Sequence, residues 1–219
     1  MHLYDRLISG LYPDARSIYG LPMQRFPAMR TAGAAMAVLM LSACAGGNFR
    51  PVRDNPVRIG PAYTIRGVTY VPAAAPAYDR VGYASWYGSE SGNRTANGER
   101  FRPGWVTAAH TTLPLPTYVE VTALDTGRRI VVRVNDRGPF AQSRRIIDLS
   151  RGAAEQLGIK ARGHAPVRVR RVEPSEKDRE RLRKGKPAGA LAPVSQSELQ
   201  ALRAQLAPTG GRVPGNAGP

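Results

Sequence analysis

The sequence predicts a mainly β fold: a small closed barrel of six short strands with one or two short helices, flanked by disordered segments. Three observations support this fold class. Short runs of β-branched and aromatic residues recur between residues 81 and 172, turn-forming residues separate them, and only one segment between them has a helical pattern. A small sheet avoids exposed strand edges by closing into a barrel. The whole chain has 219 residues, enough for one such domain and two flanks.

The strands are predicted from their period-two patterns and their boundaries. In the run from Arg129 to Asn135, Ile130, Val132 and Val134 alternate with their neighbours, and the turn formers of Asn135–Pro139 end the run. The six predicted strands are Tyr83–Tyr87, Val106–Ala109, Tyr118–Ala123, Arg129–Asn135, Ile146–Asp148 and Val167–Val172. The predicted helix follows Ser150 as N-cap and ends before Gly158, with Ala153, Ala154 and Leu157 along it.

The N-terminal segment has the pattern of a targeting signal. Residues 31–43 are uncharged and apolar, too short a run to span a bilayer, and Arg25 and Arg30 precede them. The run ends in Leu41-Ser-Ala-Cys44, which resembles a bacterial lipobox, so we expect residues 1–43 to be a signal peptide and Cys44 to be lipidated. Residues 1–22 do not fit such a signal, and Met23 or Met29 is the expected start. The alternative is an ordinary secretory signal with an incidental cysteine.

Localisation and flanking segments follow from this pattern. Ala45, rather than Asp, follows the cysteine, which resembles outer-membrane sorting and predicts a lipid-anchored protein of the bacterial envelope that faces the periplasm. Residues 44–79 are rich in Pro, Ala and Gly and are expected to be an extended linker, within which residues 63–70 form a strand on the domain edge. The domain is expected at residues 80–173. Residues 174–219 are expected to be a nearly disordered basic tail, with a short helix at Gln196–Leu206.

Charge and residue counts restrict the function class. The formal net charge of +16 favours anionic partners such as nucleic acid, acidic lipid or a polyanionic wall. No nucleic-acid-binding motif is present, so we expect no nucleic-acid partner. The single cysteine excludes an intrachain disulfide and a cysteine zinc site, and only His110 and His164 lie beyond residue 22, so we expect no metal. No phosphate-binding loop occurs, and no cofactor is expected.

Three ionisable residues follow predicted strands and are candidates for chemistry. Asp136 ends the fourth strand, His110 ends the second, and Glu99 follows the first in a turn-rich segment. Loops of a small barrel gather at its mouth, where a partly desolvated carboxyl group has a raised pKa and can protonate a leaving group. The alternatives are that Asp136 closes a turn, Glu99 is a solvated carboxylate and His110 binds a backbone carbonyl.

Several segments, in order, resemble the rare lipoprotein A (RlpA) family. They cover nearly all of residues 81–172: Gly82-Tyr-Ala-Ser-Trp-Tyr-Gly88, Arg94-Thr-Ala-Asn-Gly-Glu99, Thr107-Ala-Ala-His110, Leu113-Pro-Leu-Pro116, Val131-Val-Arg-Val-Asn-Asp-Arg-Gly-Pro-Phe140 and Arg145-Ile-Ile-Asp-Leu-Ser150. The resemblance implies a double-psi β-barrel and a septal lytic transglycosylase that cleaves the MurNAc–GlcNAc β-1,4 bond of peptidoglycan, forming a 1,6-anhydro end without water. Such an enzyme is a lyase that acts in wall remodelling and daughter-cell separation.

The resemblance also implies the site. The family's functional positions fall on Glu99, His110 and Asp136; we expect Asp136 to be the acid/base and the other two to support it or to bind glycan. Asp148 is the second candidate for the acid, with a structural role before the helix as its alternative. The expected substrate-binding residues are Trp86, Tyr87, Asn97 and Arg137.

Two departures from the family keep other functions open. Ser89-Glu-Ser-Gly-Asn93 replaces the usual Phe-His-Gly type segment, which puts loop contacts to the substrate in doubt, and no peptidoglycan-binding domain is visible after Pro174. The alternative functions are a non-catalytic, expansin-like peptidoglycan-binding lipoprotein, with Trp86 or Trp105 stacking on sugars, and an anchored scaffold with a basic surface. Cell-division proteins and wall amidases are further candidate partners.

Overall fold

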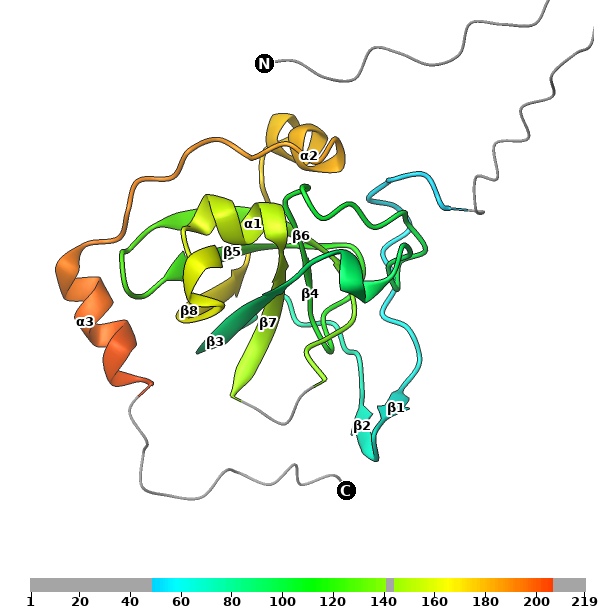
Figure 1. Ribbon diagram of the computed structural model, residues 1–219, viewed down its shortest axis with the longest axis horizontal. Helices are drawn as coiled ribbons and strands as arrows, with labels where there is room; N and C mark the ends of the chain where they lie inside the picture. Colours follow the sequence, from blue (N-terminus) through cyan, green and yellow to red (C-terminus); the bar gives the residue numbers. More distant parts are fainter. Residues whose placement is uncertain (1–48, 141–143, 207–219) are drawn as a thin grey trace, which may run out of the picture. The chain divides into compact units, whose positions relative to one another are not determined.

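The computed structural model describes residues 49–140 and 144–206, and its centre is a closed six-stranded barrel (Figure 1). The predicted signal peptide and Cys44 lie outside the described residues. The strands are β3 (Asp79–Tyr87), β4 (Thr107–Ala109), β5 (Thr117–Ala123), β6 (Arg129–Asp136), β7 (Arg145–Ser150) and β8 (His164–Arg171). Their order around the barrel is β3-β7-β4-β6-β5-β8, so the predicted fold class is confirmed.

The barrel combines parallel and antiparallel pairs. Strand β3 pairs with β7, and β4 with β6, in parallel, whereas the remaining neighbours are antiparallel. The hairpin between β5 and β6 turns at Gly127, whose φ of 74° favours glycine. The interior is filled by alternate strand residues that are fully buried, namely Val119, Val121, Val132, Val134, Ile147, Leu149, Val167 and Val169. The apolar side chains of the period-two pattern therefore point into the core.

Helix α1 (Arg151–Leu157) follows β7 and closes one part of the core. The Ser150 hydroxyl accepts a hydrogen bond from the N–H of Ala153, which is the predicted N-cap contact. Gly158 adopts the left-handed conformation and donates its N–H to the Ala154 carbonyl, as a C′ glycine does. The predicted helix is confirmed, together with the burial of Leu157.

The segment before the barrel is ordered and packed against it from residue 49 onward, which differs from the extended linker that its composition predicts. Strands β1 (Tyr63–Ile65) and β2 (Val68–Tyr70) form an antiparallel hairpin where one strand was expected. Ahead of the hairpin, Arg58 and Leu115 exchange two backbone hydrogen bonds of 2.8 Å, and the Arg50 N–H donates to the Gly98 carbonyl at 2.7 Å. These backbone contacts fix the segment, and a reading of proline and alanine content cannot reveal them.

The segment after the barrel carries two further helices, α2 (Glu176–Arg183) and α3 (Gln196–Ala204), which lie on different sides of the barrel (Figure 1). The helix predicted at Gln196–Leu206 is confirmed, but the expected disorder of residues 174–206 is wrong. A few leucines anchor these helices: Leu182 of α2 is fully buried, and Leu199 and Leu202 of α3 pack on Leu124. In the described part of the chain, no helix has the length and apolar character needed to cross a membrane.

Candidate active site

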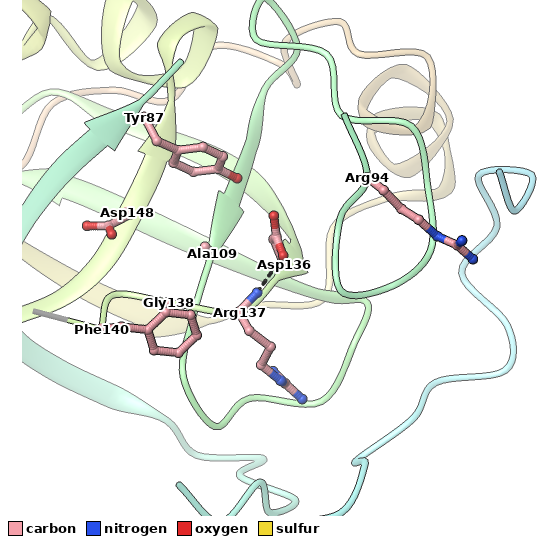
Figure 2. A pocket seen from close by; sticks show the side chains of 8 residues that line it. All are labelled: Tyr87, Arg94, Ala109, Asp136, Arg137, Gly138, Phe140 and Asp148. Atoms are coloured by element: carbon pink, nitrogen blue, oxygen red, sulfur yellow. Dashed lines mark hydrogen bonds between the residues drawn. The ribbon is translucent and has the colours of Figure 1, made fainter. Parts of the chain in front are cut away.

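A cavity of about 370 Å³ opens at the end of β6 (Figure 2). Its lining residues come from β3, β4, β6, β7 and the loops beside them: Tyr87, Arg94, Ala109, Asp136, Arg137, Gly138, Phe140 and Asp148. Asp136 is the last residue of β6, so the rigid barrel wall fixes its backbone. The cavity therefore places carboxyl groups among cationic and aromatic side chains.

One of the two oxygens of the Asp136 carboxyl group is held by hydrogen bonds. Its Oδ1 accepts the N–H of Ala96 and the N–H of Arg137, each at 2.8 Å. Within the described ranges no hydrogen bond reaches Oδ2, and the group lines the cavity. Burial raises the pKa of Asp136 above the ordinary value, although the two backbone donors and the Arg137 cation lower it in part. A carboxyl group with one restrained oxygen, one unbonded oxygen and a raised pKa is suited to proton transfer.

Glu99 lies apart from the cavity lining and is saturated by hydrogen bonds. Its side chain is 1% exposed, and both oxygens accept from Arg133, Nη1 at 2.8 Å and Nη2 at 2.9 Å. The amides of Asn97 and Asn135 each donate to it at 2.8 Å. Burial alone would lower the pKa of Arg133, but the hydrogen bonds and charge of Glu99 raise it, so the guanidinium stays charged. The contacts hold the turn of residues 95–99, from which Ala96 reaches Asp136.

His110 is also buried outside the cavity lining, and its contacts define its tautomer. Nδ1 accepts the N–H of Thr112 at 3.1 Å and of Leu113 at 3.0 Å, so the proton lies on Nε2, which donates to the Tyr78 hydroxyl at 2.9 Å. Burial, with the nearby Arg137 cation, lowers the pKa of His110 to about 4. The imidazole is therefore neutral at ordinary pH and shapes the loop after β4. The alternative stated from the sequence was a hydrogen bond between His110 and a backbone carbonyl. The structure shows instead that His110 Nδ1 accepts hydrogen bonds from two backbone N–H groups.

Asp148 and Tyr87 line the cavity together with Asp136. The Asp148 carboxylate accepts a hydrogen bond of 2.6 Å from the Ser85 hydroxyl and lies 3.5 Å from Arg145 Nε, and burial raises its pKa. Figure 2 shows the Tyr87 ring entering the cavity with its hydroxyl directed toward Asp136. Burial raises the pKa of Tyr87 well above the ordinary value, and the Asp136 charge adds to this. The Tyr87 hydroxyl therefore stays protonated and can donate.

The barrel sequence matches a known family. Residues 79–169, from the start of β3 into β8, match the family model described as "Lytic transglycolase". This domain belongs to that family. A relative from Pseudomonas aeruginosa, named endolytic peptidoglycan transglycosylase RlpA, is 48% identical over 70% of this chain and 43% of its own length. A Campylobacter jejuni protein of the same name is 39% identical over 64% of this chain and 58% of its own. The chain thus spans about half the length of these relatives.

A solved structure is also similar. The Streptomyces papain inhibitor covers 46% of this chain and all of its own, at 23% sequence identity and a TM-score of 0.39.

The structure brings together some of the predicted site residues and separates others. Tyr87, Asp136 and Arg137 line the cavity, and Asn97 lines the neighbouring hollow beside the segment of residues 50–63. Trp86 lies elsewhere: its indole N–H donates to the Lys160 carbonyl at 3.1 Å, and its ring lines a separate hollow with Gly158 and Ala161.

Four of the lining residues were not predicted as site residues, and two of the four have large side chains. Arg94 and Phe140 both contribute to the cavity wall, yet neither was named as a site residue. Arg94 is the first residue of the segment Arg94–Glu99, and Phe140 is the last residue of Val131–Phe140. Both segments carry the family resemblance, so membership in them could have indicated that these residues belong to the site.

Proposed function

We propose that this protein is an endolytic peptidoglycan transglycosylase, a lyase that cleaves the MurNAc–GlcNAc β-1,4 bond. The observation that carries the proposal is the Asp136 carboxyl group, whose pKa is raised by burial and whose Oδ2 lacks a hydrogen bond within the described residues, at the wall of an open cavity. The family match and the names of the relatives support a glycan substrate.

The reaction needs one group that first gives a proton and then takes one. Protonated Asp136 donates to the glycosidic oxygen as the bond from C1 of the muramic sugar breaks, which releases the 4-hydroxyl of the next sugar. The C6 hydroxyl of the muramic sugar attacks C1, and the Asp136 carboxylate accepts its proton. The products are a 1,6-anhydro end and a restored acid, and no water is consumed. An ordinary glycosidase instead needs two carboxyl groups that flank the bond.

Glu99 and His110 act in this proposal as positioning residues. Glu99 fixes the turn that presents the Ala96 N–H to Asp136, and His110 fixes the loop whose Leu113 carbonyl accepts from Arg137 at 2.6 Å. Tyr87 and Arg137 line the space that the glycan would occupy, and Asp148 is the second candidate for the acid.

The cellular setting is part of the same proposal. The lipobox-like segment supports a lipid anchor at Cys44, attachment to the outer membrane and a periplasmic site of action, where the enzyme would remodel the wall during cell division. Its partner is the glycan strand, and neither a cofactor nor a metal is required by the reaction.

The proposal is tested on purified sacculi, intact and after amidase digestion. The full chain is incubated with them, and soluble products are identified by mass spectrometry. We expect 1,6-anhydromuropeptides, lost in Asp136→Asn and kept in the control Asp125→Asn, a carboxylate in the hairpin at the opposite end of β6. Loss in Asp148→Asn with activity retained in Asp136→Asn would reassign the acid. Retention of sacculus binding with no product from the wild-type chain would favour the non-catalytic, expansin-like alternative.

A further inference from the structure

The segment of residues 49–63 lies beside the cavity that Asp136 lines, here termed the acid cavity. Its fixed points include Asp54, which accepts from the Tyr118 hydroxyl at 2.8 Å and from Arg133 Nε at 3.3 Å and also pairs with Arg183 of α2. The Arg133 side chain in turn donates to the Arg53 carbonyl at 2.8 Å. A segment held at so many points along its length is a rigid surface.

Between this segment and the barrel lies a second hollow of about 280 Å³, here termed the flank groove. Its lining residues are Arg50, Arg58, Ile59, Gly60, Pro61, Tyr63, Ala96, Asn97, Leu115 and Arg137. Arg137 also lines the acid cavity, so the two hollows meet at this side chain. A strand bound in the acid cavity would reach the flank groove by passing this side chain.

The charged side chains that line the flank groove are all cationic. Arg50, Arg58 and Arg137 line it, and no carboxylate is among its described lining residues. Arg137 is held by three backbone carbonyls, those of His110, Leu113 and Ile59, so its cation is fixed without a carboxylate bonded to it. Arg58 is exposed and has no ion pair within the described ranges. Guanidinium groups favour carboxylate ligands, which they bind with paired N–H donors.

We infer that the flank groove is a subsite for a carboxylate carried by a muramic sugar next to the cleaved bond. This inference rests on the proposed glycan substrate and deepens it. The carboxylate has two sources: the lactyl group of a peptide-free muramic sugar, or the stem peptide of a substituted one. In either case residues outside the matched range 79–169 contribute to substrate recognition, since Arg50 and Arg58 precede it.

Binding measurements on the full chain test the subsite separately from catalysis. The chain carries Asp136→Asn so that no strand is cut, and the probes are peptide-free glycan strands, peptide-bearing strands and chitooligosaccharides, which share the β-1,4 linkage but lack carboxylates. Adding Arg58→Gln should weaken binding of one carboxylate-bearing probe by about five- to tenfold and leave chitooligosaccharide binding unchanged. The matched control is Arg151→Gln, which removes an exposed charge on α1.

Each outcome decides the inference. Weaker binding of peptide-free strands assigns the lactyl carboxylate, and weaker binding of peptide-bearing strands alone assigns the stem peptide. Equal binding of all probes by Arg58→Gln and its parent, or an equal loss with chitooligosaccharides, overturns the subsite. Failure of the proposed function has a different signature, since wild-type chain would then yield no anhydro product whatever Arg58→Gln does to binding.

Discussion

The Asp136 carboxyl group is subject to opposing effects. Burial raises its pKa, and the N–H groups of Ala96 and Arg137 lower it, with a net rise. When the folded pKa of a carboxyl group exceeds the unfolded one, the folded state loses stability as the pH rises and the group ionises. The destabilisation is present above the folded pKa and disappears as the pH falls through it. An acid of this kind therefore reduces stability at neutral pH.

Replacement of Asp136 by asparagine should abolish activity and raise the melting temperature at pH 8. The asparagine Oδ1 can still accept from Ala96 and Arg137, while the charge that burial disfavours is gone. At pH 4, where the aspartate is more protonated, the two melting temperatures should converge. Thermal unfolding followed by circular dichroism at both pH values measures this, and a lower melting temperature for the variant at pH 8 would contradict it.

Glu99 should behave as a positioning residue. Glu99→Gln leaves the buried Arg133 cation with Asp54 as its one remaining carboxylate partner among the described residues, which should cost about 3 kcal/mol of unfolding free energy, at the lower end of the loss seen when one partner of a buried ion pair is removed. Denaturant unfolding measures the loss, and the double variant Glu99→Leu with Arg133→Met, which removes both charges, should lose less. The residual activity of Glu99→Gln should still depend on the titration of Asp136, with the profile moved to lower pH because the Glu99 charge helps to raise the pKa of Asp136. A profile that no longer depends on pH in this way would contradict the positioning role.

His110 should make stability depend on pH. The pKa is about 4 in the folded state against an ordinary value of 6.5, so the unfolded chain takes up the proton first as the pH falls. Stability should therefore decrease between pH 6.5 and 4, by about 3 kcal/mol from this group. In His110→Asn, whose side-chain oxygen can replace Nδ1 as acceptor, the decrease should be smaller. Equal slopes of unfolding free energy against pH in both proteins would refute this.

Residue chemistry was only partly predictable from the sequence. The place of Asp136 at the cavity could be predicted, because a strand pattern ends at this residue and strand ends meet at a barrel mouth. The isolation of Glu99 was not predictable, because Arg133 and Asn135 on β6 close over it from a distant part of the chain. The orientation of His110 depends on Tyr78, which a linear pattern does not connect to it.

At the scale of elements, a few buried side chains decide whether the flanks are ordered. Helix α3 is attached mainly through Leu199 and Leu202 against Leu124, in a small cluster apart from the barrel core. The many polar residues around these leucines predict disorder for the tail. The spacing of Leu199 and Leu202 nevertheless fits one face of a helix. The six strands were easier to predict, since each repeats its period-two signal over several residues.

Helix α3 should detach without loss of the barrel when its anchor is shortened. Leu199→Ala should weaken docking by about 2–4 kcal/mol, because a fully buried leucine is replaced and a cavity remains. Hydrogen exchange at residues 196–204 should become faster, while exchange in β5 and β6 and the release of anhydro products stay unchanged. Uniformly faster exchange across the barrel strands would show instead that α3 is needed for the fold.

At the scale of the whole molecule, the barrel supplies a rigid frame, and the residues at its strand ends form the cavity. Parallel pairing of β4 with β6, and of β3 with β7, brings Ala109, Asp136, Tyr87 and Asp148 to one cavity from four strands. The net charge of +16 favours attraction to an anionic wall, and the arginines near the cavity focus that attraction. The net charge alone predicts this attraction. It does not predict which part of the surface is cationic, because folding decides which arginines lie together.

The most direct test of the central claim is cleavage of sacculi by the full chain in ¹⁸O-labelled water. If Asp136 serves as both acid and base for an internal attack by the C6 hydroxyl, the products carry 1,6-anhydro ends and no ¹⁸O. Mass spectrometry should find each product end one water lighter than the hydrolysed form, and none of them in Asp136→Asn. Reducing ends that contain ¹⁸O would show that water attacks C1, and would contradict the mechanism.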